Sequence, residues 1–503
     1  MPISPLCAVR SDPQIPTSAT RTSTSPGPGA GTSIESASWR YGPRQTRACM
    51  FPVYAISHVF SNTHPLPVIT RRSCRMVLSR PRRPIRNRWS CSKRGVSVGT
   101  TTFATNIGVH MTELAHRPLA AGTGTTSPGE VLDAVAALHE LVDSYGAQND
   151  IEGRIAEPVV QALYDSGAIG VITPRELGGS EMTPRQAMDV YRTLSYADPS
   201  TGWVTMALAM STGLAGAFFE PDPAHELFAT PRLGIAGQGT RAGRAEPVEG
   251  GYLVSGQWSF ASGIKHATHL HTAAADTKTG ETRFFIVPVA QVDFVDNWDV
   301  LGLRATGSID YTLDNTFVRT EFSYPSLSTS PNTGGWLYRV GIGNFASINH
   351  GAWALGVGRR LLDELATSVQ KKSGRAGSWG DNASFHEQYA NAELRLRSAQ
   401  ALLYDVWEEI ESVLAGGERM SVRLETLNRA ALCNATEALD EIAGFVYRSA
   451  GSEALRPGVI QRLYRDVHGG TQHISSSPII LQSAGRQLAG LAEGQKWVHF
   501  QLI

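Results

Sequence analysis

This sequence lacks the long apolar runs that mark membrane-spanning helices. Hydrophobic residues make up 42% of its 503 residues, yet no run approaches the roughly 20 apolar residues that a span needs. Nucleotide-binding signatures are also missing, because no Gly-x-Gly-x-x-Gly follows a predicted strand and no Walker sequence occurs. The composition therefore predicts a sizeable apolar core, no membrane partner and no NAD(P)H site within this chain.

Cysteine is scarce as well. Only Cys433 lies beyond residue 110, and the other four cysteines lack the spacing of metal ligands, so we expect no metal site. One cysteine in the main body predicts a reducing compartment and no disulfide framework. We therefore expect a cytoplasmic protein. The four early cysteines are Cys7, Cys49, Cys74 and Cys91.

Acidic residues are nearly absent from residues 1–110, which hold 15 basic residues, 14 of them Arg, and two acidic ones. Such a Ser-, Thr- and Pro-rich segment cannot bury enough apolar surface to offset its ordering entropy, so we expect disorder. Three interpretations stay open: an over-extended start with Met111 as the true beginning, a targeting peptide, or a basic arm for nucleic acid. The last is least favoured, because no aromatic residues are interleaved as stacking platforms. We expect no nucleic-acid partner.

Three stretches of different periodicity follow this segment. Residues 111–231 read as an N-terminal helical domain, opened by the capping box Ser127-Pro128-Gly129-Glu130 and by apolar positions from Val131 to Val142. In residues 232–335 the period changes to two, with strands such as Tyr252 to Phe260, which predicts an antiparallel β domain. Residues 336–503 return to a helical period and predict a four-helix bundle, with helices near 338–371, 386–414, 420–449 and 457–490.

One stretch combines a helix with residues suited to chemistry. Apolar positions between Val459 and Val467 have helical spacing and surround the triplet Tyr464-Arg465-Asp466. Gly469-Gly470 then permits close backbone approach, and His473 follows. A histidine at such a break is either a structural cap at a helix join or a candidate for catalysis, since its charge changes near physiological pH.

This stretch resembles the C-terminal signature of the acyl-CoA dehydrogenase fold, through Ala450-Gly451, Tyr464-Arg465-Asp466, His468 and His473. More closely it is similar to the two-component flavin-dependent monooxygenases of that fold, which hydroxylate phenols, steroid phenols, indoles and thiophenes. The similarity extends over roughly residues 128–490. It implies a mostly helical α+β fold: N-terminal helices, a central β domain and a C-terminal four-helix bundle.

The sequence departs from the dehydrogenases at the catalytic base. That base is a Glu about two helical turns after the Arg-Asp pair, or a carboxylate on an earlier helix, and these positions are Ile474 and the neighbourhood of Ala346. Removing the α-proton of a thioester needs such a carboxylate. The resemblance therefore favours a monooxygenase, with an acyl-CoA dehydrogenase or a non-catalytic scaffold of the same fold as alternatives.

The resemblance also implies which residues surround the flavin. Ser262 and His473 are the candidate catalytic residues, one near flavin N5 and the other beside flavin and substrate. Arg375 matches an Arg that holds the FAD pyrophosphate of a neighbouring subunit, but the Phe that often follows it is missing, which leaves FMN open. The candidate flavin-binding residues are Trp203, Gln257, Trp258, Ser259, Phe260, Ser262, Arg304, Arg375, Ala450, Gly451 and His473.

The implied function is that of the oxygenase component of a two-component enzyme. Reduced FAD or FMN would come from a separate NAD(P)H-dependent flavin reductase. Dioxygen would add to it as a C4a-peroxyflavin, and one oxygen atom would pass to a small aromatic or heteroaromatic substrate. Because the family's flavin site is shared between subunits, we expect a homodimer or homotetramer.

Overall fold

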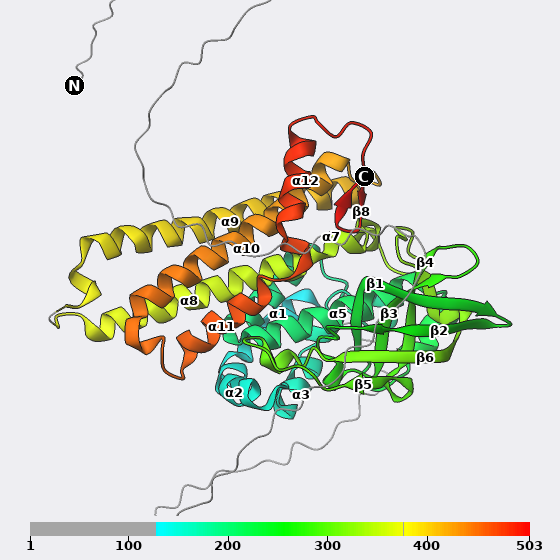
Figure 1. The fold of residues 1–503 in the computed structure, drawn as a ribbon, viewed down its shortest axis with the longest axis horizontal. Coiled ribbons are helices and arrows are strands. Elements are labelled where there is room, and N and C mark those ends of the chain that lie inside the picture. Colours follow the sequence, from blue (N-terminus) through cyan, green and yellow to red (C-terminus); the bar gives the residue numbers. More distant parts are fainter. Residues whose placement is uncertain (1–126, 376) are drawn as a thin grey trace, which may run out of the picture. The chain divides into compact units, whose positions relative to one another are not determined.

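The computed structural model describes residues 127–375 and 377–503. The predicted disordered segment 1–110 lies outside them, as do the first residues of the predicted helical domain 111–231. The described chain passes from short helices into a sheet and then into long helices (Figure 1). This order confirms the predicted mostly helical α+β fold. No helix in these ranges is both long and apolar enough to cross a membrane.

The helices before the sheet begin at the predicted capping box. The Glu130 amide donates to Ser127 Oγ, and the Glu130 carboxylate accepts from the Ser127 amide. The predicted helix from Val131 to Val142 is two helices, because the first one ends at a C-cap on Leu138. The elements are α1 Pro128–Ala137, α2 His139–Glu152, α3 Glu157–Asp165, α4 Pro184–Ala197, α5 Pro199–Phe218 and α6 Pro221–Phe228.

Helix α5 is buried along nearly its whole length, because other elements surround it. Small, apolar and hydroxyl-bearing residues are buried on every side of it, as expected of a helix inside a protein. Asp198 caps it by accepting hydrogen bonds from the Thr201 amide and hydroxyl. A Cβ on Gly202 would lie 2.1 Å from Ser195 Oγ, so only glycine permits this close packing of α5 on α4.

The sheet contains seven strands in the order β5-β6-β2-β1-β3-β4-β7. The predicted antiparallel pairing needs one correction, because β1 and β3 run parallel. Strand β1 was not predicted, since its Gly- and Arg-containing sequence gives no clear alternation. The strands are β1 Ile235–Val248, β2 Gly251–Trp258, β3 His269–Asp276, β4 Thr282–Pro288, β5 Asp293–Val295, β6 Asp310–Arg319 and β7 Ser323–Pro325.

Long helices form the C-terminal part, and α8, α9 and α10 run side by side (Figure 1). The helix predicted near 457–490 is two helices, with a break at residues 471–477 that carries His473. The helix predicted near 338–371 contains a π-helical turn, Ser347–Gly351. The elements are α7 Ile342–Ala346, α8 Ala352–Lys372, α9 Ala383–Ala415, α10 Val422–Ala450, α11 Val459–Gly470, α12 Pro478–Leu488, β8 Trp497–Val498 and β9 Gln501–Leu502.

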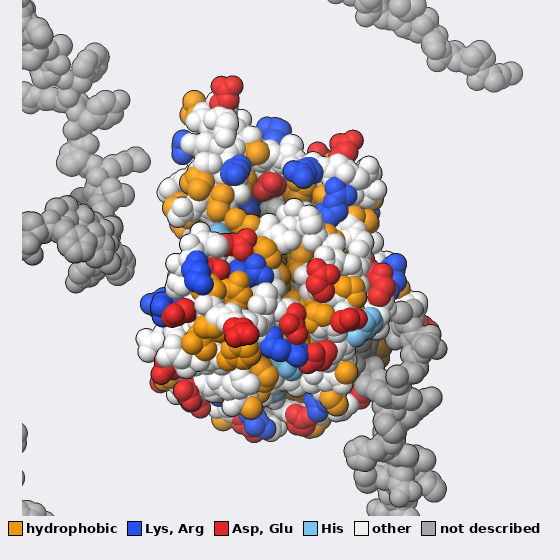
Figure 2. Space-filling model, turned by 90° about the vertical axis from the view of Figure 1, so that its right-hand side faces the viewer, with side chains coloured by type: hydrophobic (Ala, Val, Ile, Leu, Met, Phe, Trp, Pro, Cys, Tyr) orange, Lys and Arg blue, Asp and Glu red, His pale blue; other side chains and the backbone are white. Residues whose placement is uncertain are grey.

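Two glycines allow α11 to pack closely on its neighbours. A Cβ on Gly302 would lie 1.9 Å from the Arg465 carbonyl, and a Cβ on Gly470 would lie 2.2 Å from the Trp353 ring. The loop after β5 and helix α8 therefore touch α11 directly. At the sheet end of the molecule, side chains of both charge signs are interspersed with apolar ones (Figure 2).

Candidate active site

Four rings meet where α5, the π-helical turn, α8 and the break after α11 come together. The Trp203 ring lies edge-on to His350 at 4.7 Å, to Trp353 at 5.2 Å and to His473 at 5.7 Å between centroids. Trp353 Nε1 donates to the Pro199 carbonyl at 3.0 Å, which ties α8 to the first turn of α5. The structure thus brings together two predicted residues, Trp203 and His473, and adds His350.

A chain of hydroxyl groups joins this ring cluster to the loops of the sheet. Trp203 Nε1 donates to Ser262 Oγ at 3.2 Å, and Ser262 Oγ lies 2.7 Å from Ser308 Oγ. Ser308 Oγ is in turn 2.7 Å from Thr306 Oγ1, which donates to the Leu303 carbonyl. Each hydroxyl has one proton, and a carbonyl only accepts. Ser308 therefore donates to Thr306 and Ser262 donates to Ser308, which leaves Ser262 Oγ as an acceptor on its free side.

Phe260 lies on the same loop and is 64% exposed. Its φ of 70° is in the left-handed region, which non-glycine residues rarely adopt. Such strain, on the order of 1–3 kcal/mol, persists only where the surroundings impose it, and it clusters at ligand sites. Here the amides of Ala261 and Gly263 donate to the Ile309 and Thr306 carbonyls. The loop offers an exposed aromatic ring and a hydroxyl acceptor to a planar ligand.

His473 lies in the break between α11 and α12. Its Nδ1 accepts a hydrogen bond from the Ser475 amide at 3.3 Å and lies 2.7 Å from Ser475 Oγ. Burial lowers the pKa of His473 to about 4, so the ring is neutral near pH 7. His473 therefore caps the turn Ile474–Ser476, as the helix-join interpretation predicts, and also faces the ring cluster.

His350 was missed by sequence reasoning. Its ring stacks on His473 with 3.9 Å between centroids and 21° between planes, and its Nδ1 lies 3.2 Å from the Ala346 carbonyl. Burial, with a further contribution from His473, holds the pKa of His350 well below its ordinary range. The continuous helical period over residues 338–371 gives no sign of the π-helical turn. Such turns occur frequently at functional sites, but they have no sequence signature here.

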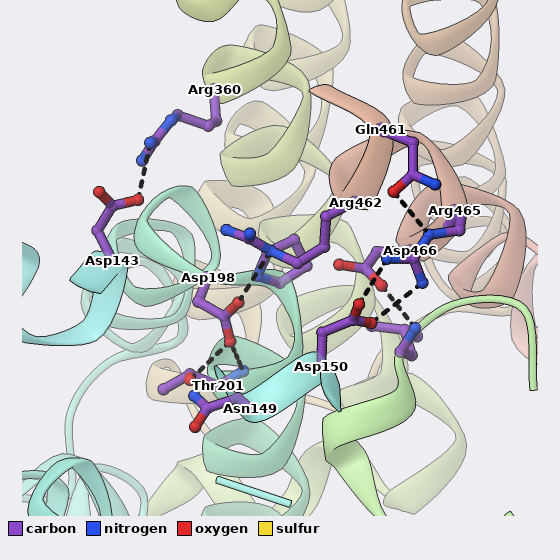
Figure 3. A network of polar contacts seen from close by, with 12 residues as sticks. Asp143, Asn149, Asp150, Asp198, Thr201, Arg360, Gln461, Arg462, Arg465 and Asp466 are labelled. Atoms are coloured by element: carbon purple, nitrogen blue, oxygen red, sulfur yellow. Dashed lines mark hydrogen bonds and ion pairs between the residues drawn. The ribbon is translucent and has the colours of Figure 1, made fainter. Parts of the chain in front are cut away.

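Charged residues hold α11 against α2 (Figure 3). Arg465 Nη1 and Nη2 donate to the two carboxylate oxygens of Asp150 at 3.0 and 2.6 Å. The neighbouring Asp466 accepts a hydrogen bond from the Leu303 amide at 2.6 Å. Since Leu303 also accepts from Thr306, this contact connects α11 to the hydroxyl chain that ends at Ser262.

Asp466 and Asp198 are both buried in this network. Burial, together with the neighbouring Asp198, raises the pKa of Asp466 to about 8. Burial also raises the pKa of Asp198, which Arg462 and the Thr201 hydrogen bonds oppose. Arg462 Nε lies 4.0 Å from Asp198 Oδ1. Because Asp198 caps α5, the network positions α5, which carries Trp203, and α11, which precedes His473.

Trp258 is buried within the sheet, and its flavin-binding role stays a prediction. The side chain is 1% exposed, its ring stacks on Tyr311 with centroids 5.3 Å apart, and its Nε1 donates to the carbonyls of Arg241 and Ala273. Gln257 lies on the opposite face of β2 by strand alternation, and Ser259 follows the end of that strand. The flavin-binding roles of both stay predictions.

Arg304 has protein partners for much of its guanidinium. Nε donates to the Asp150 carbonyl at 3.1 Å, and Nη1 donates to the Val300 carbonyl and to the Asp299 carboxylate at 3.0 and 3.2 Å. These contacts match the interpretation of Arg304 as a structural residue that joins the loop to α2. Its flavin-binding role stays a prediction.

Two other predicted flavin residues lie at a different end of the molecule. Arg375 is on the turn after α8, and Gly451 follows α10, and both ends lie away from the sheet (Figure 1). The Lys372 ammonium and Ser368 Oγ both donate to Glu453, which ties the two ends together. Ala450 is buried beside Gly451, whose φ is 60°. This group and Ser262 lie at opposite ends of the helices.

A large cavity also lies away from the ring cluster. It measures about 710 Å³ and is bounded by α1, α4, α8 and α9, with Arg192, Arg359, Tyr404 and Leu355 among its walls. The two positions where a dehydrogenase would place its base hold apolar residues. Ile474 lies beside His473 and is 43% exposed, and Ala346 precedes the π-helical turn.

Comparisons with known proteins match both helical parts. The family model "Acyl-CoA dehydrogenase, N-terminal domain" matches residues 131–217, and "Acyl-CoA dehydrogenase, C-terminal domain" matches residues 348–478. Indole-3-acetate monooxygenase of Pseudomonas putida is 25% identical over 72% of this chain and 96% of its own length. The oxygenase component of the FADH(2)-dependent resorcinol hydroxylase of Rhizobium sp. is 27% identical over 73% of this chain and 94% of its own.

A solved structure shows the same fold. XiaF from Streptomyces sp., in complex with FADH2 and glycerol, aligns with a TM-score of 0.68 at 20% identity, covering 72% of this chain and 96% of XiaF.

Proposed function

Because this chain has the acyl-CoA dehydrogenase fold and falls in the family of flavin-dependent monooxygenase oxygenase components, we propose that it hydroxylates a small aromatic or heteroaromatic molecule. It uses dioxygen and a reduced flavin, FADH2 or FMNH2, that a separate flavin reductase delivers. Relatives named for indole-3-acetate and resorcinol support an aromatic substrate.

The orientation of the Ser262 hydroxyl carries this proposal. Reduced flavin has an N–H at N5, whereas oxidised flavin has an unprotonated nitrogen there. The Ser262 proton is directed to Ser308, so the free side of its oxygen accepts and matches the reduced form. Trp203, bonded to this oxygen, and the exposed Phe260 two residues before Ser262 supply aromatic surface. The residues therefore fit a reduced isoalloxazine ring.

The flavin, when bound, supplies the electrons that activate dioxygen. The residues of this chain orient the reactants and limit the access of water. Neutral His473, whose Nδ1 accepts from Ser475, carries its proton on Nε2 and can donate a hydrogen bond there. The Trp203 ring lies edge-on to His473 at 5.7 Å between centroids, and such apolar surroundings strengthen a hydrogen bond by lowering the local dielectric.

The dehydrogenase alternative is disfavoured by the residues around His473. Abstraction of a carbon-bound α-proton requires a base within reach of the flavin-bound substrate. The positions that would supply a carboxylate are Ile474 and Ala346. The buried carboxylate of Asp466 is occupied by the Leu303 amide.

The flavin site is, in this proposal, shared between two subunits. Arg375 follows the end of α8, whereas Ser262 is bonded to Trp203, whose ring contacts Trp353 in the first turn of α8. A neighbouring copy that presents its Arg375 turn would contact the phosphate-bearing tail of a flavin whose ring lies beside Ser262. The bidentate guanidinium is suited to phosphate. A homodimer or homotetramer follows from this arrangement.

Turnover assays test the proposal. The full chain is combined with NADH, a generic flavin reductase and either FAD or FMN, and is offered a panel of phenols and indoles. We expect one oxygen atom from labelled dioxygen in at least one product, with wild-type turnover exceeding that of Ser262→Ala. Absence of labelled product from every member of the panel, with both flavins, would contradict it.

A further inference from the structure

The stacked imidazoles of His350 and His473 have opposite tautomers. His350 Nδ1 faces the Ala346 carbonyl at 3.2 Å, and because a carbonyl only accepts, this nitrogen carries the proton. His473 Nδ1 instead accepts from the Ser475 amide at 3.3 Å, so its proton is on Nε2. Local hydrogen bonds to backbone groups therefore leave Nε2 without a proton in His350 and with a proton in His473.

The two Nε2 atoms are the unused polar atoms of the cluster. Neither of them has a hydrogen-bond partner among residues 127–375 and 377–503, whereas the other polar atoms of the cluster, Trp203 Nε1 and Ser262 Oγ, are bonded to each other. Both imidazoles keep part of their surface exposed. Burial lowers the pKa of both rings, so both remain neutral near pH 7.

The pair consequently presents one acceptor, His350 Nε2, and one donor, His473 Nε2–H. Resting on the hydroxylase function proposed above, we propose that His350 recognises the substrate by accepting a hydrogen bond from its hydroxyl group. A free phenolic hydroxyl both donates and accepts, so it satisfies both nitrogens at once. An indole N–H can pair only with His350. A thiophene sulfur or an aryl ether has no proton to donate and leaves His350 unpaired.

The energetic consequence is selectivity against substrates that lack the donor. A site built around a buried acceptor penalises an analogue that leaves this acceptor unpaired. The cost of one unpaired buried group, about 1–3 kcal/mol, corresponds to roughly 5- to 150-fold in affinity. His350 is therefore assigned to specificity, and this role does not depend on the role of Ser262.

Binding of a matched pair of probes under anaerobic conditions tests this role. Calorimetry with the full chain and reduced FAD measures the affinities of 2-naphthol and of 2-methoxynaphthalene, which differ in the hydroxyl proton. We expect wild type to prefer 2-naphthol by roughly 5- to 150-fold. His350→Phe keeps an aromatic face toward His473 but has no acceptor, so the preference should fall close to one.

Two variants separate recognition from packing. His350→Gln supplies an amide oxygen that accepts, and it should keep more of the preference than His350→Phe. His225→Phe, on α6 outside the cluster, should keep all of it. Equal weakening of both probes in His350→Phe would indicate packing alone and overturn the proposal, as would a wild-type preference near one. Failure of the hydroxylase function would instead appear as absent product, with the binding preference intact.

Discussion

The indole nitrogen of Trp203 donates a hydrogen bond to the hydroxyl of Ser262 across 3.2 Å, although 59 residues separate the two along the chain. Trp203 belongs to the first helical part and Ser262 to the sheet. This bond, with the Ser262–Ser308–Thr306 chain, sets the direction in which the Ser262 oxygen can accept. The orientation of the proposed flavin partner therefore depends on contacts from both parts.

Removal of the Ser262 hydroxyl should uncouple oxygen consumption from hydroxylation. In Ser262→Ala the N5–H of a bound reduced flavin loses its acceptor, a change on the order of 1–3 kcal/mol or about 5- to 150-fold in partitioning. We expect more hydrogen peroxide and less product for each NADH consumed. Ser330→Ala, which removes the hydroxyl of an exposed serine outside this loop, is the control. Unchanged coupling in Ser262→Ala would exclude the assigned role.

Asp466 should make stability depend on pH in the opposite sense to an ordinary carboxylate. Its folded pKa of about 8 exceeds its ordinary value of 3.8, so the folded chain keeps a proton that the unfolded chain releases. The free energy of unfolding should therefore fall as pH rises from about 4 to about 8. Charged groups facing it include Asp198, Asp150 and Arg462.

Asp466→Asn, which stays neutral at every pH, should flatten this fall. Urea unfolding of wild type and variant between pH 5 and about 9 measures it. The control is Asp133→Asn, which changes an exposed carboxylate on α1. Parallel pH profiles for wild type and Asp466→Asn would show that Asp466 is ionised in the folded chain.

His473 should make the free energy of unfolding depend on pH in the opposite direction to Asp466. Its folded pKa of about 4 lies below its ordinary value of 6.5, so the unfolded chain takes up a proton first as pH falls. Its stabilising contribution is present above pH 6.5 and is lost as pH falls toward 4. His473→Gln should reduce the slope of unfolding free energy against pH in this window, whereas His225→Gln should not. His350 is the titratable group stacked on His473, and it contributes to the pH dependence of stability in both variants.

Much of the fold could be predicted from the sequence because it depends on periodicity. The capping box at Ser127 and the change from a helical to a two-residue period near residue 232 both correspond to elements of the structure. Strand β1 was missed because glycines interrupt its alternation. Its parallel pairing with β3 depends on contacts between distant segments, which a local pattern does not encode.

The candidate site was predictable only in part, for a similar reason. Trp203, Ser262 and His473 were found through resemblance, and the structure places them together. Trp258 was assigned to the flavin through the same resemblance, whereas its stacking on Tyr311 depends on strand pairing that alternation along β2 does not reveal. His350 was missed because its partner His473 lies on another element and the π-helical turn between α7 and α8 looks like ordinary helix in sequence.

Subunit complementation should reveal whether two copies share each site. Charge reversal in Arg375→Glu should weaken flavin binding, because the exposed guanidinium is proposed to bind the phosphates of the neighbouring copy's flavin. Ser262→Ala damages the other half of the same site. In a mixed dimer of the two variants, one site carries both changes and the other carries neither.

Co-expression of Arg375→Glu and Ser262→Ala chains should therefore restore activity that neither variant has alone. Random pairing in a twofold-symmetric dimer would leave about a quarter of all sites intact, and selection of the mixed dimers would raise this to about half. Product formation and flavin affinity are measured on co-purified protein carrying two different tags, with light scattering to establish its oligomeric state. Arg423→Glu, at an exposed position on α10, controls for the reversed charge. Recovery is impossible if each chain binds its flavin alone, so an inactive mixed dimer would show that Ser262 and Arg375 serve the site of their own chain and would overturn the shared site.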